Sequence, residues 1–125
     1  MNRRCFLLAT AAIFSAGKAL AQHSHSHEGK HGGIVVEAGD FHAELVARND
    51  TIDVYVRDHD DREMSLAGYK GVAIFTLAGK AQRVPLEPVE DNRLSGKAPG
   101  VLPTRIRMAV QITPPGKRAF TAKFG

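Results

Sequence analysis

The fold is decided by the run Phe41–Arg57, which reads FHAELVARNDTIDVYVR. Apolar residues occupy every second position on both sides of Asn49-Asp50, a dipeptide typical of turns. These positions are Phe41, Ala43, Leu45 and Ala47 before the turn, and Ile52, Val54 and Val56 after it. A period of two is typical of strands with one buried face. The run therefore predicts an antiparallel hairpin.

The rest of the chain continues as short strands separated by Gly, Pro, Asn and Asp. Gly71–Ala78 is apolar on both faces, as in a central strand, whereas Pro85 restricts the run 81–86 to an edge or a bulge. Further strands are expected over 93–97, 106–112 and 120–124, and no long stretch has a helical period. We therefore predict an all-β fold, a small antiparallel β-sandwich or barrel-like domain of seven or eight short strands over residues 34–125.

Length and composition agree with one small domain. The chain has 125 residues, of which 43% are hydrophobic and 24% are charged, and it contains one Cys. A core of aliphatic side chains is feasible, but an internal disulfide is not. No segment reaches the roughly 18 apolar residues that a membrane-spanning helix needs.

The first 21 residues have the pattern of a secretory signal peptide. A basic start, Met1–Arg4, precedes the moderately apolar stretch 6–17, and Ala19–Ala21 has the small-x-small form of a cleavage site. The run Arg3–Leu7 resembles a twin-arginine signal, with an ordinary Sec signal as the alternative. We expect residues 1–21 to be removed on export to a bacterial periplasm.

Removal of residues 1–21 changes the charge. The full chain carries +4, whereas residues 22–125 hold 14 basic and 13 acidic residues, a net of +1. Near-neutrality and export argue against nucleic-acid binding, and no membrane insertion is expected after cleavage. Residues 22–63 have a net charge of −6 and residues 64–125 one of +7. One explanation of this division is an acidic end of the domain that attracts cations. The other is that strands from the two halves pair, so that their opposite charges interleave.

The segment Gln22–Gly33, QHSHSHEGKHGG, has nothing to bury and is expected to be a flexible tail. Its imidazoles belong to His23, His25, His27 and His31. Imidazole suits copper, zinc and nickel, and side chains at i and i+2 of an extended chain point to the same side. This spacing predicts binding of a transition metal ion (Cu, Zn, Ni or Co). The alternative is a polar spacer that binds metal only as any histidine tag does.

Two further histidines are candidate metal ligands on the β domain. His42 lies on the polar face of the first long strand, where a surface histidine paired with a neighbour is the alternative. His59 lies among the carboxylates of Asp58–Asp61, which could hold a divalent cation. The alternative is an ordinary polar loop that follows a strand. Residues 22–125 contain no Cys nucleophile, Gly-rich phosphate loop or HExxH motif, so we do not expect an enzyme.

Several stretches resemble a module of bacterial heavy-metal resistance. They are His31–Val46, Val54–Asp60, Leu86–Pro88 and Asp91–Leu94. Together, over about residues 29–125, they are similar to the N-terminal β module of periplasmic adaptor subunits of heavy-metal efflux pumps, and to small stand-alone proteins found with such systems. The resemblance implies a β-sandwich-like domain and a role in copper, zinc, cobalt or nickel handling. The helical hairpin of a full adaptor is missing here, so bridging two membranes is not expected.

Two functions follow from these features. The first is a periplasmic metal-binding accessory protein that buffers an ion or delivers it to a heavy-metal efflux partner. The second is a non-catalytic interaction module that docks on an envelope efflux partner through an exposed strand edge, with the histidines incidental.

We predict that metal affinity falls steeply below about pH 6, because protonated imidazole cannot bind a metal ion. Calorimetric titrations at about pH 7.5 and about pH 5 measure this change. Tight binding retained at the lower pH would contradict a site made of imidazoles alone.

Overall fold

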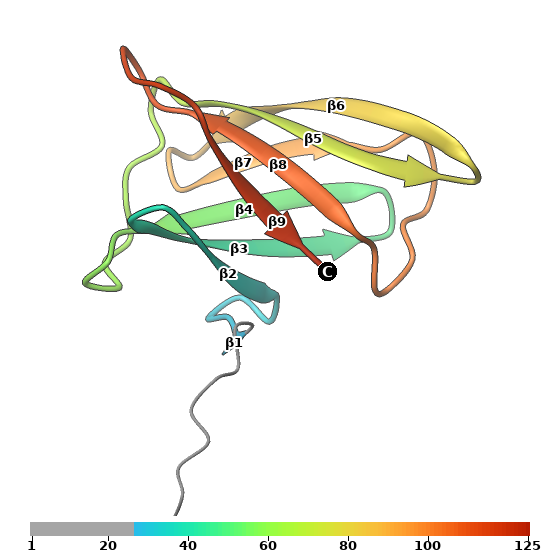
Figure 1. Cartoon of the computed structure of the whole chain (residues 1–125), viewed down its shortest axis with the longest axis horizontal. Coiled ribbons are helices and arrows are strands. Elements are labelled where there is room, and N and C mark those ends of the chain that lie inside the picture. Colours follow the sequence, from blue (N-terminus) through green and yellow to red (C-terminus); the bar gives the residue numbers. More distant parts are fainter. Residues whose placement is uncertain (1–26) are drawn as a thin grey trace, which may run out of the picture.

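The computed structural model describes residues 27–125, which form an all-β, antiparallel domain, as predicted (Figure 1). Within this range no helix is long and apolar enough to cross a membrane. The strands are β1 (His27–Glu28), β2 (Ile34–Ala38), β3 (Phe41–Arg48), β4 (Thr51–Arg57), β5 (Lys70–Leu77), β6 (Lys80–Val89), β7 (Arg93–Lys97), β8 (Met108–Thr113) and β9 (Phe120–Phe124).

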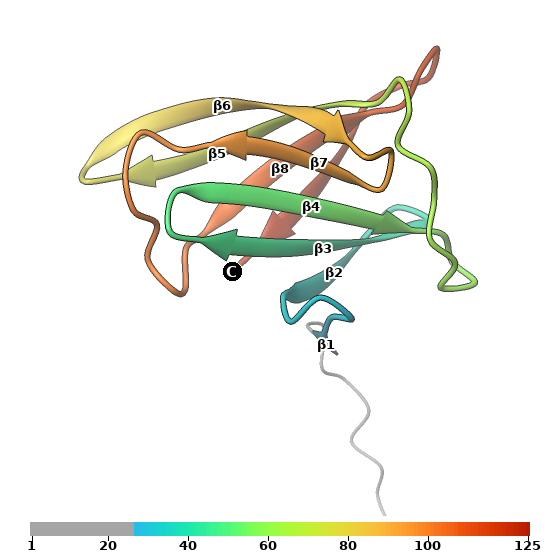
Figure 2. The ribbon, with the colours of Figure 1, turned by 180° about the vertical axis from the view of Figure 1, so that it is seen from behind.

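The strands form one curled sheet in the order β1-β2-β3-β4-β7-β6-β5-β8-β9. β6 belongs to both halves of it, because Lys80–Leu86 pairs with β5 and Glu87–Val89 pairs with β7. The two halves face each other (Figure 2), and β2 approaches β9 without pairing to it. The result is a nearly closed, barrel-like sandwich.

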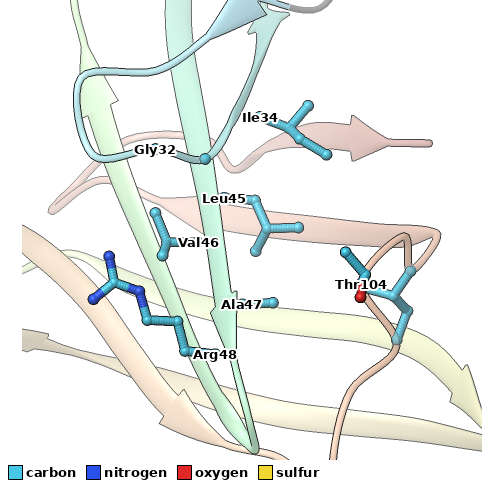
Figure 3. A pocket seen from close by; sticks show the side chains of 9 residues that line it. Gly32, Ile34, Leu45, Val46, Ala47, Arg48 and Thr104 are labelled. Carbon is cyan, nitrogen blue, oxygen red and sulfur yellow. The ribbon is translucent and has the colours of Figure 1, made fainter.

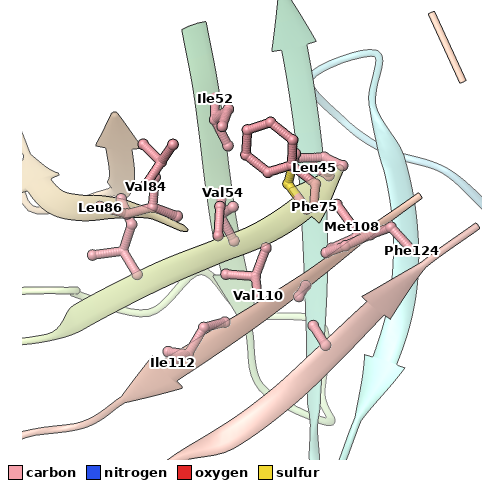
Figure 4. Close-up of a cluster of buried hydrophobic side chains, with 14 of the residues drawn as sticks. Leu45, Ile52, Val54, Phe75, Val84, Leu86, Met108, Val110, Ile112 and Phe124 are labelled. Atoms are coloured by element: carbon pink, nitrogen blue, oxygen red, sulfur yellow. The ribbon is translucent and has the colours of Figure 1, made fainter. Parts of the chain in front are cut away.

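The core lies between the two halves and consists mainly of aliphatic side chains (Figure 4). The predicted hairpin is confirmed, since β3 and β4 pair from His42–Arg57 to Arg48–Thr51. Its inward side chains include Ala43, Leu45, Ile52, Val54 and Val56, all at most 4% exposed. They meet Phe75, Met108, Val110 and Phe124 from β5, β8 and β9. The period of two thus places one face of each strand in the core.

Pro85 lies where β6 passes from one half of the sheet to the other. It is opposite Val72 of β5, and only two residues later Glu87 is opposite Ser95 of β7. Gly96 of β7 lies against this point, because a Cβ atom there would come within 2.5 Å of the Pro85 carbonyl oxygen. Gly96 therefore allows the backbones of β6 and β7 to approach closely at the bend.

We predict that Gly96→Ala lowers the free energy of unfolding by about 1–3 kcal/mol, because the added methyl group forces two backbones apart. Denaturant unfolding followed by circular dichroism measures this loss. Gly100→Ala is the matched control, since its Cβ would meet only the Leu77 side chain at 3.5 Å. Equal stability of both variants would contradict the close approach at Gly96.

Candidate functional site

The candidate site is built on Glu44, a carboxylate on the outer face of β3. Its Oε2 atom accepts hydrogen bonds from the backbone N–H groups of His31 and Gly33, each 2.9 Å long. The Gly29–Gly33 loop closes on itself through bonds from the Gly29 N–H to the Gly33 carbonyl and from the Gly32 N–H to the Gly29 carbonyl. Gly32 has a φ of 78°, which favours glycine. The loop is therefore bound to the sheet through one side chain.

This loop also explains why a charged residue is buried. Glu44 is 1% exposed, although it occupies a polar position of the strand pattern. Gly29 lies so close that a Cβ atom there would overlap the Glu44 carboxylate. Glu44 Oε1 has no hydrogen-bond partner among the described residues. A buried carboxylate needs charge-assisted hydrogen bonds, so the two amides of the loop are the compensation that the structure provides.

The imidazole of His31 is held in one place on the outer face. It stacks on the Tyr55 ring of β4, with centroids 3.6 Å apart and 9° between the planes. Its Nε2 atom lies 3.6 Å from Glu63 Oε1, and its side chain is 32% exposed. His31 and Glu63 are therefore two potential metal donors that face each other at the surface.

The Asp58–Glu63 loop brings Glu63 to this position. Asp58 Oδ1 accepts hydrogen bonds from the N–H groups of Asp60 and Arg62, each 2.9 Å long. The backbones of Glu63 and Arg57 form an isolated antiparallel β-bridge. The Arg62 N–H is the main cause that keeps the pKa of Asp58 below its ordinary value. Because the pKa of Asp58 is lower in the folded protein, the ionised carboxylate stabilises the fold at pH values above the ordinary carboxyl pKa. This stabilisation is lost as the pH falls through the lowered pKa.

Ion pairs connect the two loops. Lys30 of the Gly29–Gly33 loop lies 3.6 Å from Asp61, and Arg57 lies 3.1 Å from the other oxygen of that carboxylate. Asp61 itself adopts a φ of 62°, a backbone conformation that Asp tolerates at turns. The candidate site is therefore the pair His31 and Glu63, supported by Tyr55, Glu44 and these ion pairs.

Of the predicted metal ligands, the three with described side chains, His31, His42 and His59, are not gathered in one cluster. His42 Nε2 lies 3.8 Å from Glu37, and His59 Nε2 lies 3.5 Å from Asp60 on a side chain that is 75% exposed. Across the described part of the chain, no three His, Cys, Asp or Glu side chains lie close enough to hold one metal ion. His23 and His25 lie outside the described residues, and of His27 the structure describes only the backbone in β1.

The Gly29–Gly33 loop, which precedes the expected domain start at Ile34, is bound to the sheet. The expected flexible tail covered residues 22–33; its last five residues, Gly29–Gly33, instead form a loop bound to Glu44, and residues 22–26 lie outside the described residues. The physical reason is the pair of backbone N–H groups that satisfies the Glu44 carboxylate. Sequence reasoning missed Glu44, Tyr55 and Glu63 because their roles depend on contacts between segments distant in the chain.

A small hollow of about 190 Å³ lies beside the loop (Figure 3). Its labelled lining consists of Gly32, Ile34, Leu45, Val46, Ala47, Arg48 and Thr104. These side chains are mostly apolar and include one cation, so this hollow has no donors suited to a metal ion. The metal donors lie instead on the surface at His31 and Glu63.

No family model, curated protein or solved structure matches the chain.

We predict that Glu44→Ala releases the Gly29–Gly33 loop, because hydrogen bonds to a charged acceptor contribute about 1.5–3 kcal/mol. Amide hydrogen exchange at His31 and Gly33 should accelerate at least about tenfold, while exchange at core residues such as Val54 changes little. Glu37→Ala is the control, since that carboxylate is exposed and faces His42. Unchanged protection at His31 in Glu44→Ala would contradict this attachment.

Proposed function

We propose that this chain is an exported, non-catalytic protein that binds a transition metal ion through its histidine-rich segment. In this proposal His31 and Glu63 are the fixed donors, and His23, His25 and His27 supply the others. The observation that carries it is the position of the His31 imidazole, stacked on Tyr55 and 3.6 Å from Glu63.

The separation of these two donors suits a shared ion. Zinc binds imidazole nitrogen and carboxylate oxygen at about 2.0–2.2 Å in tetrahedral geometry, so two such donors lie roughly 3.4 Å apart. Nε2 of His31 and Oε1 of Glu63 already lie 3.6 Å apart. Little rearrangement is needed for both to contact one ion, which lowers the entropy cost of assembling the site.

The course of the backbone supports a contribution from the preceding histidines. β1 pairs His27 with Val35, β2 pairs Val35 with Glu44, and β3 pairs Glu44 with Tyr55. His27 therefore occupies the same cross-strand row as Tyr55, but three strands away, about 14 Å at the usual strand spacing. His25 and His23 precede His27 by two and four residues, a length of chain that spans about 7–14 Å when extended, enough to reach His31 and Glu63.

Charge at the site favours a cation. Asp58, Asp60, Asp61 and Glu63 lie in one exposed loop, and only part of their charge is matched by Arg57, Arg62 and Lys30. Such a loop raises the local concentration of divalent ions. Together with the resemblance to heavy-metal efflux modules, this supports a role in buffering copper, zinc, nickel or cobalt, or in delivering it to an efflux pump component in the periplasm.

Calorimetric titration of Cu(II), Zn(II), Ni(II) and Co(II) into the exported protein, without a purification tag, tests the proposal. We predict submicromolar binding of at least one ion. Substituting Gln at His23, His25 and His27 together should weaken it by at least about a hundredfold, because multidentate binding depends on each donor. Glu63→Gln should weaken it by about tenfold.

His42→Gln and His59→Gln are the matched controls, because they remove imidazoles that the structure places in other pairs. Substitution is preferable to deleting residues 22–33, which would also remove the partners of Glu44. Binding no tighter than about 10 μM for all four ions would contradict the proposed function. A loss confined to the control variants would move the site to His42 or His59.

A further inference from the structure

The two fixed donors of the proposed metal site come from different segments of the chain. His31 belongs to the Gly29–Gly33 loop, which joins β1 to β2 (Figure 1), and Glu63 belongs to the Asp58–Glu63 loop. The 3.6 Å between His31 Nε2 and Glu63 Oε1 applies to the position of the Gly29–Gly33 loop in this structure, which we call closed. The contacts that hold this loop closed therefore also determine how often the two donors are together.

Few contacts hold the loop closed. Within the described part of the chain, its buried polar attachment is the Glu44 carboxylate, which accepts the N–H groups of His31 and Gly33 through one oxygen. The ion pair of Lys30 with Asp61 is 3.6 Å long, but both side chains are 57% exposed, so water and salt weaken it. The stack of the His31 ring on β4 is a further contact. Glu44 is therefore the main polar attachment of the loop.

The burial of Glu44 opposes closure at the same time. The closed loop leaves this side chain 1% exposed, and Gly29 lies against its carboxylate. Glu44 Oε1 has no hydrogen-bond partner among the described residues, so closure takes this oxygen out of water without a replacement. When the loop opens, both oxygens regain water. The favourable and unfavourable contributions of Glu44 therefore partly cancel, which keeps the open state accessible.

A bound ion adds an attachment that the metal-free loop lacks. An ion shared by His31 and Glu63 joins the Gly29–Gly33 loop to the Asp58–Glu63 loop, and this connection exists only while the first loop is closed. Binding and closure are therefore linked. The ion shifts the loop towards closure, and any change that opens the loop lowers the apparent affinity in proportion to the closed fraction that is lost.

Given the proposed metal function, on which this inference rests, we propose that Glu44 is a positioning residue for the metal site. It sets the affinity by holding the Gly29–Gly33 loop closed, and the ion leaves when this loop opens. Opening separates His31 from Glu63 and leaves the ion with fewer ligands. The hydrogen bond from the Gly29 N–H to the Gly33 carbonyl lies within the loop, so the loop keeps its shape as it moves. Release of this kind suits a protein that delivers its ion to a partner.

Two variants open the loop by different means and leave every proposed ligand in place. Glu44→Ala removes the acceptor of both N–H groups, whereas Gly29→Ala keeps Glu44 and adds a Cβ atom that would overlap its carboxylate in the closed loop. In calorimetric titrations of the exported protein with Cu(II), Zn(II), Ni(II) and Co(II), each variant should bind the preferred ion about tenfold more weakly. Gly100→Ala is the matched control and should bind as the unaltered protein does, since its Cβ would meet only the Leu77 side chain.

A double variant separates positioning from a general loss of structure. Once the loop is open, Glu63 no longer shares an ion with His31, so Glu63→Gln should weaken binding little further. Gly29→Ala combined with Glu63→Gln should bind within about threefold of Gly29→Ala alone. Two independent tenfold effects would instead multiply to about a hundredfold loss, and that result would overturn the inference.

Amide hydrogen exchange of the unaltered protein tests the same coupling without a variant. A saturating concentration of the preferred ion should slow exchange of the His31 and Gly33 amides at least about tenfold, because these N–H groups exchange from the open loop. Exchange at Val54 in the core should change little. Mass spectrometry of fragments that cover residues 29–33 measures this change for any of the four ions.

The outcomes distinguish this inference from the proposed function. Unchanged exchange at His31 and Gly33 in a protein that binds the ion would overturn the inference and leave the proposed function standing. Affinity equal to that of the unaltered protein in both Glu44→Ala and Gly29→Ala would do the same. Binding of all four ions to the unaltered protein no tighter than about 10 μM would contradict the proposed function and, with it, this inference.

Discussion

The arrangement of the candidate site depends on one interaction, the pair of hydrogen bonds from the backbone of His31 and Gly33 to the carboxylate of Glu44. A carboxylate that is 1% exposed is costly unless it is hydrogen-bonded, so the sheet and the loop stabilise each other. The Gly29–Gly33 loop covers the Glu44 carboxylate, and the carboxylate accepts the hydrogen bonds that hold the loop in place. His31 then has a defined backbone position, and its ring can stack on Tyr55 and face Glu63.

Opposite charges are gathered on different parts of this small domain. The acidic loop Asp58–Glu63 lies beside His31, whereas Arg105, Arg107 and Lys123 line a groove of about 800 Å³ beside Gly125. The sequence already shows this division, with an acidic first half and a basic second half after residue 21. Partial interleaving also occurs, since Arg93 of β7 lies 3.7 Å from Asp53 of β4. At this pair the charges of the two halves interleave, which is one of the two explanations that the sequence left open.

The sequence predicts the β3–β4 hairpin and its buried face because alternation is a local signal. Glu44 could not be identified in this way, because its position in the alternation is an outward one and the loop that covers it lies 11 to 13 residues earlier. Pro85 was expected to restrict the run 81–86 to an edge or a bulge, and this run indeed pairs with β5 alone. The close approach of Gly96 of β7 to the Pro85 carbonyl could not be predicted from the sequence. The burial of Glu44 and the bend at Pro85 thus depend on contacts between distant segments, which the local alternation of residues does not specify.

β6 has a consequence for the motions of the domain. One strand is hydrogen-bonded to β5 along most of its length and to β7 at its end, so opening either half of the sheet at β6 disturbs the other. The central strands therefore form a single cooperative unit. The Gly29–Gly33 loop is held by far fewer bonds and can open and close on a faster timescale. Opening of the Gly29–Gly33 loop would therefore leave the central strands folded.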